Sequence, residues 1–181
     1  MMLPPFPAYK NYLAAALAIC FVSILTCIGA AAPESPVEGN IARKTDEVKN
    51  WRFEQHEDAK GTISVESGAI VFDVTKDDGT DWHVQAFQTP LDLKDGTEYI
   101  VTFKAKSEGV RPARLQAGID EDDWHNVGLD EEITLGREWK DYDYKFTAND
   151  TRPMKNRIGF VLGMEKGKVY VKDLVLKPAK K

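Results

Sequence analysis

Residues 81–107, DWHVQAFQTPLDLKDGTEYIVTFKAKS, decide the fold that we predict for this chain. Two runs of alternating apolar and polar residues flank an Asp95-Gly96 pair. In the second run, from Tyr99 to Phe103, every second residue is apolar, so these side chains share one face of a strand. An Asp-Gly pair between two such runs is a strong signal for a tight turn. The stretch therefore predicts two strands, each with one apolar face.

The same pattern continues through the rest of the chain. Short alternating runs recur, separated by Gly, Asp, Asn and Pro, and Ser67-Gly68 is the expected turn of a strand pair. The alternation assigns to the core Ile70, Phe72, Val74, Tyr99, Val101, Phe103, Ala105, Leu115, Ala117, Ile119, Ile158, Phe160 and Leu162. No window of useful length has a helical period. About nine or ten such strands predict an all-β protein, a β-sandwich jelly roll of two antiparallel sheets.

The beginning of the chain is expected to be a targeting segment. Lys10 is the only charged residue before Glu34, residues 12–28 are apolar, and small residues follow them. This order of basic, apolar and small-residue regions is that of a secretory signal peptide, which we predict to span residues 1–31. An uncleaved membrane anchor is the less favoured alternative, because a stable span usually needs about twenty apolar residues.

The remainder of the chain is expected to form one domain. Residues 32–50 are predicted to be a linker or first edge segment, and residues 51–178 to be the β-sandwich domain. The signal peptide predicts a secreted or periplasmic protein with no membrane contact after its removal. Cys20 and Cys27 both lie in the signal peptide, so the domain is held without disulfides. The net charge of −5, with no basic stripe, argues against a nucleic-acid partner.

The order of motifs in residues 81–107 resembles the central signature of carbohydrate-binding modules of families four and nine. In these cellulose-, xylan- and glucan-binding jelly rolls, Trp-x-Val-Gln leads through Gln to Leu-x-Leu, then to Gly-x-x-Tyr and Phe-x-Ala-Lys. The matching residues are Trp82, Val84, Gln85, Gln88, Leu91, Leu93, Gly96, Tyr99, Phe103, Ala105 and Lys106. Residues 157–178 are similar to the family's closing strand pair. The resemblance implies a galactose-binding-like fold that binds a polysaccharide or oligosaccharide, usually in company with a glycoside hydrolase.

The resemblance also implies a structural calcium ion, with Asp173 in the closing strand as a ligand. The alternative for Asp173 is a surface carboxylate between Lys172 and a buried Leu174. The acidic run 120–123 lacks the spacing of an EF-hand, and the three histidines are too dispersed for a zinc site. The sequence therefore predicts no required cofactor.

The strand that begins near Trp82 supplies the first candidate ligand contacts. A sugar is bound by an aromatic ring against its apolar face and by planar polar groups against its hydroxyls. Alternation places Trp82 and Val84 on the core side of this strand. It places His83, Gln85 and Phe87 on the outer face. These three are either ligand contacts or the half-exposed face of an ordinary sheet.

Two later segments supply further candidates. Arg114 and Gln116 share the polar face of their strand, as ligand contacts or as a solvated cross-strand ladder. If this strand neighbours the strand of residues 83–87, the polar side chains form one patch. Trp124 follows an acidic run in a loop, where a core is not expected. It is the favoured stacking platform, and a lid folded back on the sandwich is its alternative.

A secreted, non-catalytic carbohydrate-binding module is the function that these residues favour. A structural or protein-interaction β-sandwich is the first alternative, and a glycan-active hydrolase or accessory subunit of a glycoside hydrolase is the second. A glycosidase needs two positioned carboxylates, and no strand places a clear inward-facing acid pair. The chain has no Gly-x-Ser-x-Gly motif either. No catalytic residue is predicted.

Overall fold

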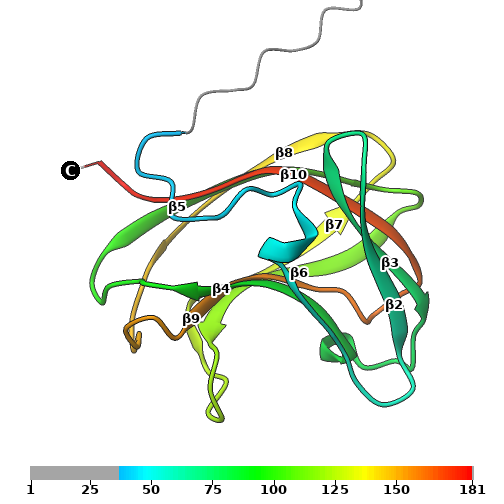
Figure 1. Ribbon diagram of the computed structural model, residues 1–181, viewed down its shortest axis with the longest axis horizontal. Helices are drawn as coiled ribbons and strands as arrows, with labels where there is room; N and C mark the ends of the chain where they lie inside the picture. The colour runs from blue at the N-terminus through cyan, green and yellow to red at the C-terminus, as the bar shows by residue number, and fades with distance from the viewer. Residues whose placement is uncertain (1–36, 181) are drawn as a thin grey trace, which may run out of the picture. The chain divides into compact units, whose positions relative to one another are not determined.

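The structure is a computed structural model that describes residues 37–180 of the 181-residue chain. These residues form two antiparallel five-stranded sheets packed face to face (Figure 1). The predicted signal peptide, residues 1–31, lies outside the described residues. Among residues 37–180, no helix is long and apolar enough to cross a membrane.

The chain passes repeatedly from one sheet to the other, as in a jelly roll. The first sheet contains, in spatial order, β1 (Arg52–Gln55), β4 (Val84–Leu91), β9 (Asn156–Val161), β6 (Arg111–Ile119) and β7 (Asn126–Leu135). The second contains β2 (Lys60–Glu66), β3 (Ala69–Lys76), β10 (Gly167–Pro178), β5 (Glu98–Ser107) and β8 (Lys140–Thr147). Single 3-10 turns, Val48–Asn50 and Asp81–His83, precede β1 and β4. The all-β sandwich prediction is confirmed.

The core lies between the sheets and contains every position that alternation assigned to it except Trp82. Phe103 of β5 and Phe160 of β9 meet across the sandwich, edge to face, with ring centroids 5.2 Å apart. Such a pair contributes beyond the burial of its area, because the edge of one ring is attracted to the face of the other. Full burial of a phenylalanine stabilises the fold by about 1.5–3 kcal/mol. The two sheets are therefore held together by side chains that a local pattern predicts.

The segment before β1 is hydrogen-bonded to the last strand. The Ile41 amide donates to the Leu176 carbonyl at 2.8 Å. The Leu174 amide donates to the Thr45 hydroxyl oxygen at 2.9 Å. Unpaired backbone groups at a strand edge need such partners. These bonds fix the part of residues 32–50 that the structure describes against the domain.

The turn Asp81–His83 overturns the prediction that Trp82 lies in the core. The residues up to His83 form a turn of 3-10 helix, and β4 begins only at Val84. A 3-10 turn has about three residues per turn, so the two-residue alternation of the strand does not extend back to Trp82. Val84 is buried as predicted, whereas Trp82 is 49 % exposed.

Trp51, by contrast, closes one end of the core. Its ring lies 5.2 Å from that of Phe72, and its indole nitrogen donates to the Thr45 carbonyl at 2.8 Å. We expect Trp51→Ala to lower the free energy of unfolding by about 3–5 kcal/mol, because it empties a packed site. Urea denaturation measures this. Trp82→Ala is the matched control and should cost less than about 1 kcal/mol; similar losses in both variants would contradict the assignment of core and surface.

Candidate functional site

A cleft of about 490 Å³ is hollowed into the outer face of the first sheet. Its lining residues come from β1 and the residue after it, the turn before β4, β4 itself, β9, β6 and the β6–β7 loop. They are Glu54, His56, Trp82, Gln85, Gln116, Trp124 and Arg157. Small-molecule sites typically enclose about 300–1,000 Å³. The cleft is thus of a size to hold a small organic ligand or part of a larger one.

Two half-exposed tryptophans line this cleft. Trp82 is 49 % exposed and Trp124 is 51 % exposed. The Trp82 ring packs against the rings of His56 and His83, with centroids 5.2 and 4.2 Å away. Large aromatic rings left in contact with water inside a concavity are typical of binding sites. Trp124 is therefore placed as its loop sequence predicts, and Trp82 joins it.

Arg157 of β9 connects the floor of the cleft to Trp124. Its guanidinium carbon lies 4.0 Å from the centroid of the Phe87 ring and 5.0 Å from that of the Trp124 ring. Burial lowers the pKa of Arg157, although arginine stays charged at any physiological pH. Among residues 37–180, no hydrogen bond or ion pair joins its side chain to another residue. Its N–H groups therefore remain available to a ligand in the cleft.

An ion-pair network lies beside the cleft at Glu54. Arg52 Nε is 2.7 Å from Glu54 Oε1, and Arg52 Nη1 donates to Asp120 Oδ2 at 2.7 Å. The Thr89 hydroxyl donates to the same Asp120 oxygen at 3.0 Å. Partial burial opposes ionisation, but these hydrogen bonds outweigh it and lower the pKa of Asp120. The charged pair fixes the loop after β6 to the edge strand β1.

The structure brings three of the six predicted ligand contacts into the cleft: Gln85, Gln116 and Trp124. Arg114 lies on the same outer face but outside the lining, where it faces three carboxylates. Its Nε is 3.0 Å from Asp130 Oδ1, and its Nη1 is 3.4 Å from Asp81 Oδ2. Most of its donors are thus directed at the protein's own acids.

Two predicted contacts support the cleft from beneath or behind it. Phe87 is on the outer face, as alternation predicts, but it is fully buried under Arg157, so its ring does not reach a ligand. His83 is 8 % exposed, and its Nδ1 is hydrogen-bonded to Asp78 Oδ2 at 2.6 Å. This bond lowers the pKa of Asp78. His83 packs behind Trp82 and holds that ring in place.

The strand of Arg114 and Gln116 is not the direct neighbour of the strand of residues 83–87, so the condition for a single patch of adjacent strands is not met. β9 lies between β4 and β6, so that Phe87 pairs with Gly159 and Gly159 pairs with Gln116. The inserted strand carries Arg157, which, like Glu54, His56 and Trp82, was not among the predicted ligand contacts. Alternation with the buried Ile158 is the signal that would have placed Arg157 on the outer face.

Asp173 lies at an irregularity of β10, which belongs to the second sheet, whereas the strands of the cleft belong to the first. Pairing with β5 shifts between Lys172 and Val175, and Asp173 is exposed with a positive φ of 56°. Calcium takes about six to eight oxygen ligands. Residues 37–180 contain no group of three His, Cys, Asp or Glu side chains that would hold a metal ion. The side chains around Asp173 therefore do not form a carboxylate cage, and calcium there stays a prediction.

The sequence of residues 38–167, more than half of the chain, matches the family model described as "Carbohydrate binding domain". The chain belongs to this family. The resemblance that the motifs of residues 81–107 predict is thereby confirmed, and binding of carbohydrate is the function that family membership gives this domain. No curated protein sequence matches the chain.

Solved structures of carbohydrate-binding modules share this fold. A structure described as "CBM4 structure and function" is similar with a TM-score of 0.67 at 24% identity, over 80% of this chain and 100% of that one. The N-terminal cellulose-binding domain of Cellulomonas fimi β-1,4-glucanase C is similar with a TM-score of 0.60 at 17% identity, over 82% and 99%. The CBM22-1-GH10 modules of Clostridium thermocellum xylanase 10B with xylohexaose are similar with a TM-score of 0.54 at 15% identity, over 80% and 29%.

The Asp120–Arg52 pair gives the domain a measurable acid sensitivity. We expect Asp120→Asn to lower the free energy of unfolding at neutral pH by about 1–2 kcal/mol, because Arg52 loses a charged partner that solvent partly screens. The pKa of Asp120 is lower in the folded state, so its contribution is present above the unfolded-state pKa and is lost as the pH falls through the folded-state pKa. The difference between variant and wild type should shrink in acid.

Urea unfolding at neutral and acidic pH measures this difference. Asp141→Asn is the control, because the Asp141–Lys104 pair lies on the surface with an 82 % exposed carboxylate and should contribute little. A difference between Asp120→Asn and wild type that stays constant into acid would show that the charge of Asp120 is not what stabilises the fold.

Proposed function

We propose that the domain binds a polysaccharide, or an oligosaccharide cut from one, in the cleft of the first sheet. The observation that carries this proposal is the meeting, in one cleft, of two half-exposed tryptophans with the guanidinium of Arg157, which has no hydrogen-bond or ion-pair partner among residues 37–180. The indole rings of Trp82 and Trp124 offer flat apolar surfaces to the C–H faces of pyranose rings. Sugar recognition needs such surfaces beside forked polar groups.

The polar groups of the cleft suit the hydroxyl rim of a sugar. Gln85 and Gln116 each offer an amide that donates and accepts, and Arg157 offers a planar fork of donors. Glu54 adds a carboxylate that accepts hydrogen bonds. Each hydroxyl must exchange water for these partners, so the net gain per hydrogen bond is small. We therefore expect weak binding of a single short sugar, with the tryptophans supplying most of the affinity.

The proposal extends to the setting in which the domain acts. The signal-peptide pattern of residues 1–31 supports a secreted or periplasmic location. Family membership, together with a similar structure that contains both a carbohydrate-binding and a GH10 module, supports action beside a glycoside hydrolase. In that role the domain would hold an enzyme near an insoluble or polymeric substrate. Linked binding sites gain affinity through effective concentration, which compensates for weak single-site binding.

Substitution of the cleft residues tests the binding proposal. We expect Trp82→Ala and Trp124→Ala each to weaken binding by about tenfold or more, because each removes a stacking surface at the centre of the site. Isothermal titration with soluble cellulose, xylan and mixed-linkage glucan oligosaccharides measures the change. Full retention of affinity in both variants would place the sugar elsewhere.

The arginines of the outer face provide a matched pair for the same titrations. Arg157→Lys keeps the charge but loses the planar fork and its fit between two rings, so it should weaken binding by several-fold, or about 1 kcal/mol. Arg114→Lys is the control, because Arg114 lies on the same face outside the cleft lining. Equal effects of the two substitutions would mean that overall surface charge, and not the cleft, governs binding.

A further inference from the structure

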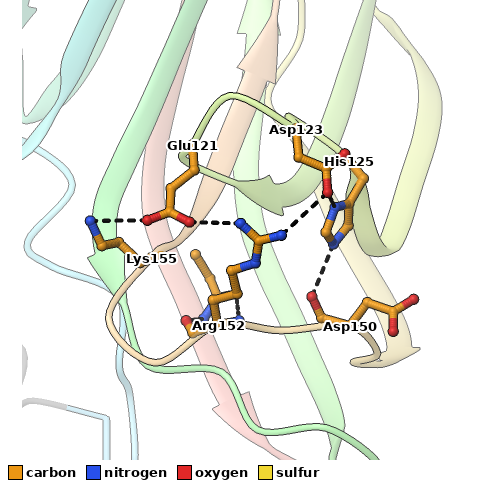
Figure 2. Close-up of polar contacts among 7 residues, drawn as sticks. Glu121, Asp123, His125, Asp150, Arg152 and Lys155 are labelled. Carbon is orange, nitrogen blue, oxygen red and sulfur yellow. Dashed lines mark hydrogen bonds and ion pairs between the residues drawn. The ribbon is translucent and has the colours of Figure 1, made fainter.

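We infer that His125, which does not line the cleft, is a positioning residue for Trp124 and makes sugar binding stronger in mildly acidic solution than in alkaline solution. The inference rests on the proposed function, because Trp124 is one of its two stacking surfaces. His125 is the next residue in the β6–β7 loop. Its ring lies between two loops that are far apart in sequence (Figure 2).

The Trp124 loop is held in an unfavourable backbone conformation. Trp124 has a φ of +50°, in the left-handed region that bulky side chains rarely adopt. Such a residue costs about 1 kcal/mol or more and persists only where its surroundings hold it. The Trp124 amide donates to the Glu121 carbonyl at 2.8 Å, and the Ile119 amide donates to the His125 carbonyl at 2.9 Å. The rest of the restraint comes from side chains.

Ion pairs from the loop that precedes β9 supply part of this restraint. Glu121 contacts Arg152 Nη1 at 2.7 Å and Lys155 Nζ at 3.1 Å, and Arg152 Nη2 lies 3.4 Å from Asp123 Oδ2. Figure 2 shows Arg152 between the two acids. Hydrogen bonds from Arg152 and Lys155 lower the pKa of Glu121, so this pairing stays ionised at neutral and alkaline pH.

His125 supplies the part that depends on pH. Its Nδ1 lies 2.8 Å from Asp123 Oδ2, and its Nε2 lies 2.9 Å from the Asp150 carbonyl oxygen. A carboxylate and a carbonyl only accept hydrogen bonds, so each contact requires a proton on the imidazole nitrogen. Neutral imidazole carries one N–H, and only the imidazolium ion carries two. Protonated His125 therefore keeps both its bond to Asp123 within the β6–β7 loop and its bond to Asp150 in the loop before β9. Neutral His125 loses one of the two bonds.

The direction of the pH effect follows from the groups that face the ring. The Asp150 carbonyl and the Asp123 carboxylate raise the pKa of His125, and partial burial and Arg152 oppose them. Because the pKa is higher in the folded state, the restraint is complete below the ordinary histidine pKa and is lost as the pH rises through the raised value. The ion pairs of Glu121 remain, so the loop loosens but is not released. Trp124 then spends less time against Arg157, and the sugar loses part of its stacking surface.

The first experiment needs no sugar. The chain has four tryptophans, and Trp124→Phe identifies which indole N–H resonance of the ¹⁵N-labelled full chain belongs to Trp124. We expect this resonance to shift with the titration of His125 between about pH 5 and 9, and to stay still in His125→Gln. A Trp124 resonance that shifts equally in His125→Gln would overturn the inference.

The second experiment measures sugar affinity over the same pH range. Exposed charged pairs are worth less than about 1 kcal/mol, so the dissociation constant of wild type should rise about two- to fivefold from acid to alkaline pH. In His125→Gln the dissociation constant should not change with pH over this range. His56→Gln is the control for a histidine that lines the cleft. In this variant the ratio of the dissociation constants at alkaline and acid pH should equal that of wild type, even if both constants change.

Asp123→Asn is the second variant, and it keeps the histidine. The asparagine amide can donate to unprotonated Nδ1, so the contact survives deprotonation and the pH dependence should disappear. If His125→Gln and Asp123→Asn both keep the wild-type ratio of dissociation constants between alkaline and acid pH, the inference is refuted while sugar binding stands. If the Trp124 resonance titrates as expected but no sugar binds at any pH, the proposed function fails and the positioning of Trp124 by His125 stands alone.

Discussion

The cleft depends on where the guanidinium of Arg157 lies. A buried charge is costly unless it is compensated, and here the Phe87 and Trp124 rings cover Arg157 from two segments of the chain. Each cation–π contact of this partly desolvated kind contributes about 1–2 kcal/mol. Because β9 is the central strand of the first sheet, a side chain on its outer face reaches both the β4 floor and the β6–β7 loop. Gly118 beside it allows the β6–β7 loop to approach closely, since a Cβ there would lie only 3.0 Å from the His125 carbonyl oxygen.

The layers of the fold follow from the sequence because burial with a period of two is a local property. The alternation around Phe103 and around Phe160 can be read from a few neighbouring residues, and both side chains are in the core. The order of strands within a sheet is not local. β9 pairs with β4 and β6, whose residues are some forty to seventy positions earlier in the chain, and no alternation records that choice. This is why the sequence leaves open whether Arg114 and Gln116 lie beside β4, and why it does not place Arg157 between the two strands.

The candidate residues show the same division between local and distant causes. Trp124 was placed correctly because its acidic neighbours exclude a core, which is a local fact. Phe87 was placed on the correct face, but the side chain that covers it comes from a distant strand. Trp82 was misplaced because the strand pattern was extended through a 3-10 turn, although the Asp-rich, glycine-containing residues before it favour a turn. The face of a strand on which a side chain lies is thus predictable from the sequence. The exposure of that side chain is predictable only where the residues that would cover it are close in sequence.

Trp82 and Trp124 are held in place by different forces, and the parts of the cleft that they line therefore have different physical properties. Trp82 is packed against His56 and His83, and the His56 amide donates to the His83 carbonyl at 2.8 Å, so short-range contacts fix it. Trp124 is held in a strained backbone by ion pairs of exposed side chains. Ionic strength screens such pairs with a Debye length of about 8 Å at physiological salt, and it leaves ring packing almost unchanged. Trp82 is therefore fixed by packing, whereas the position of Trp124 responds to ionic strength and pH. Any adjustment of the cleft to its surroundings arises at Trp124.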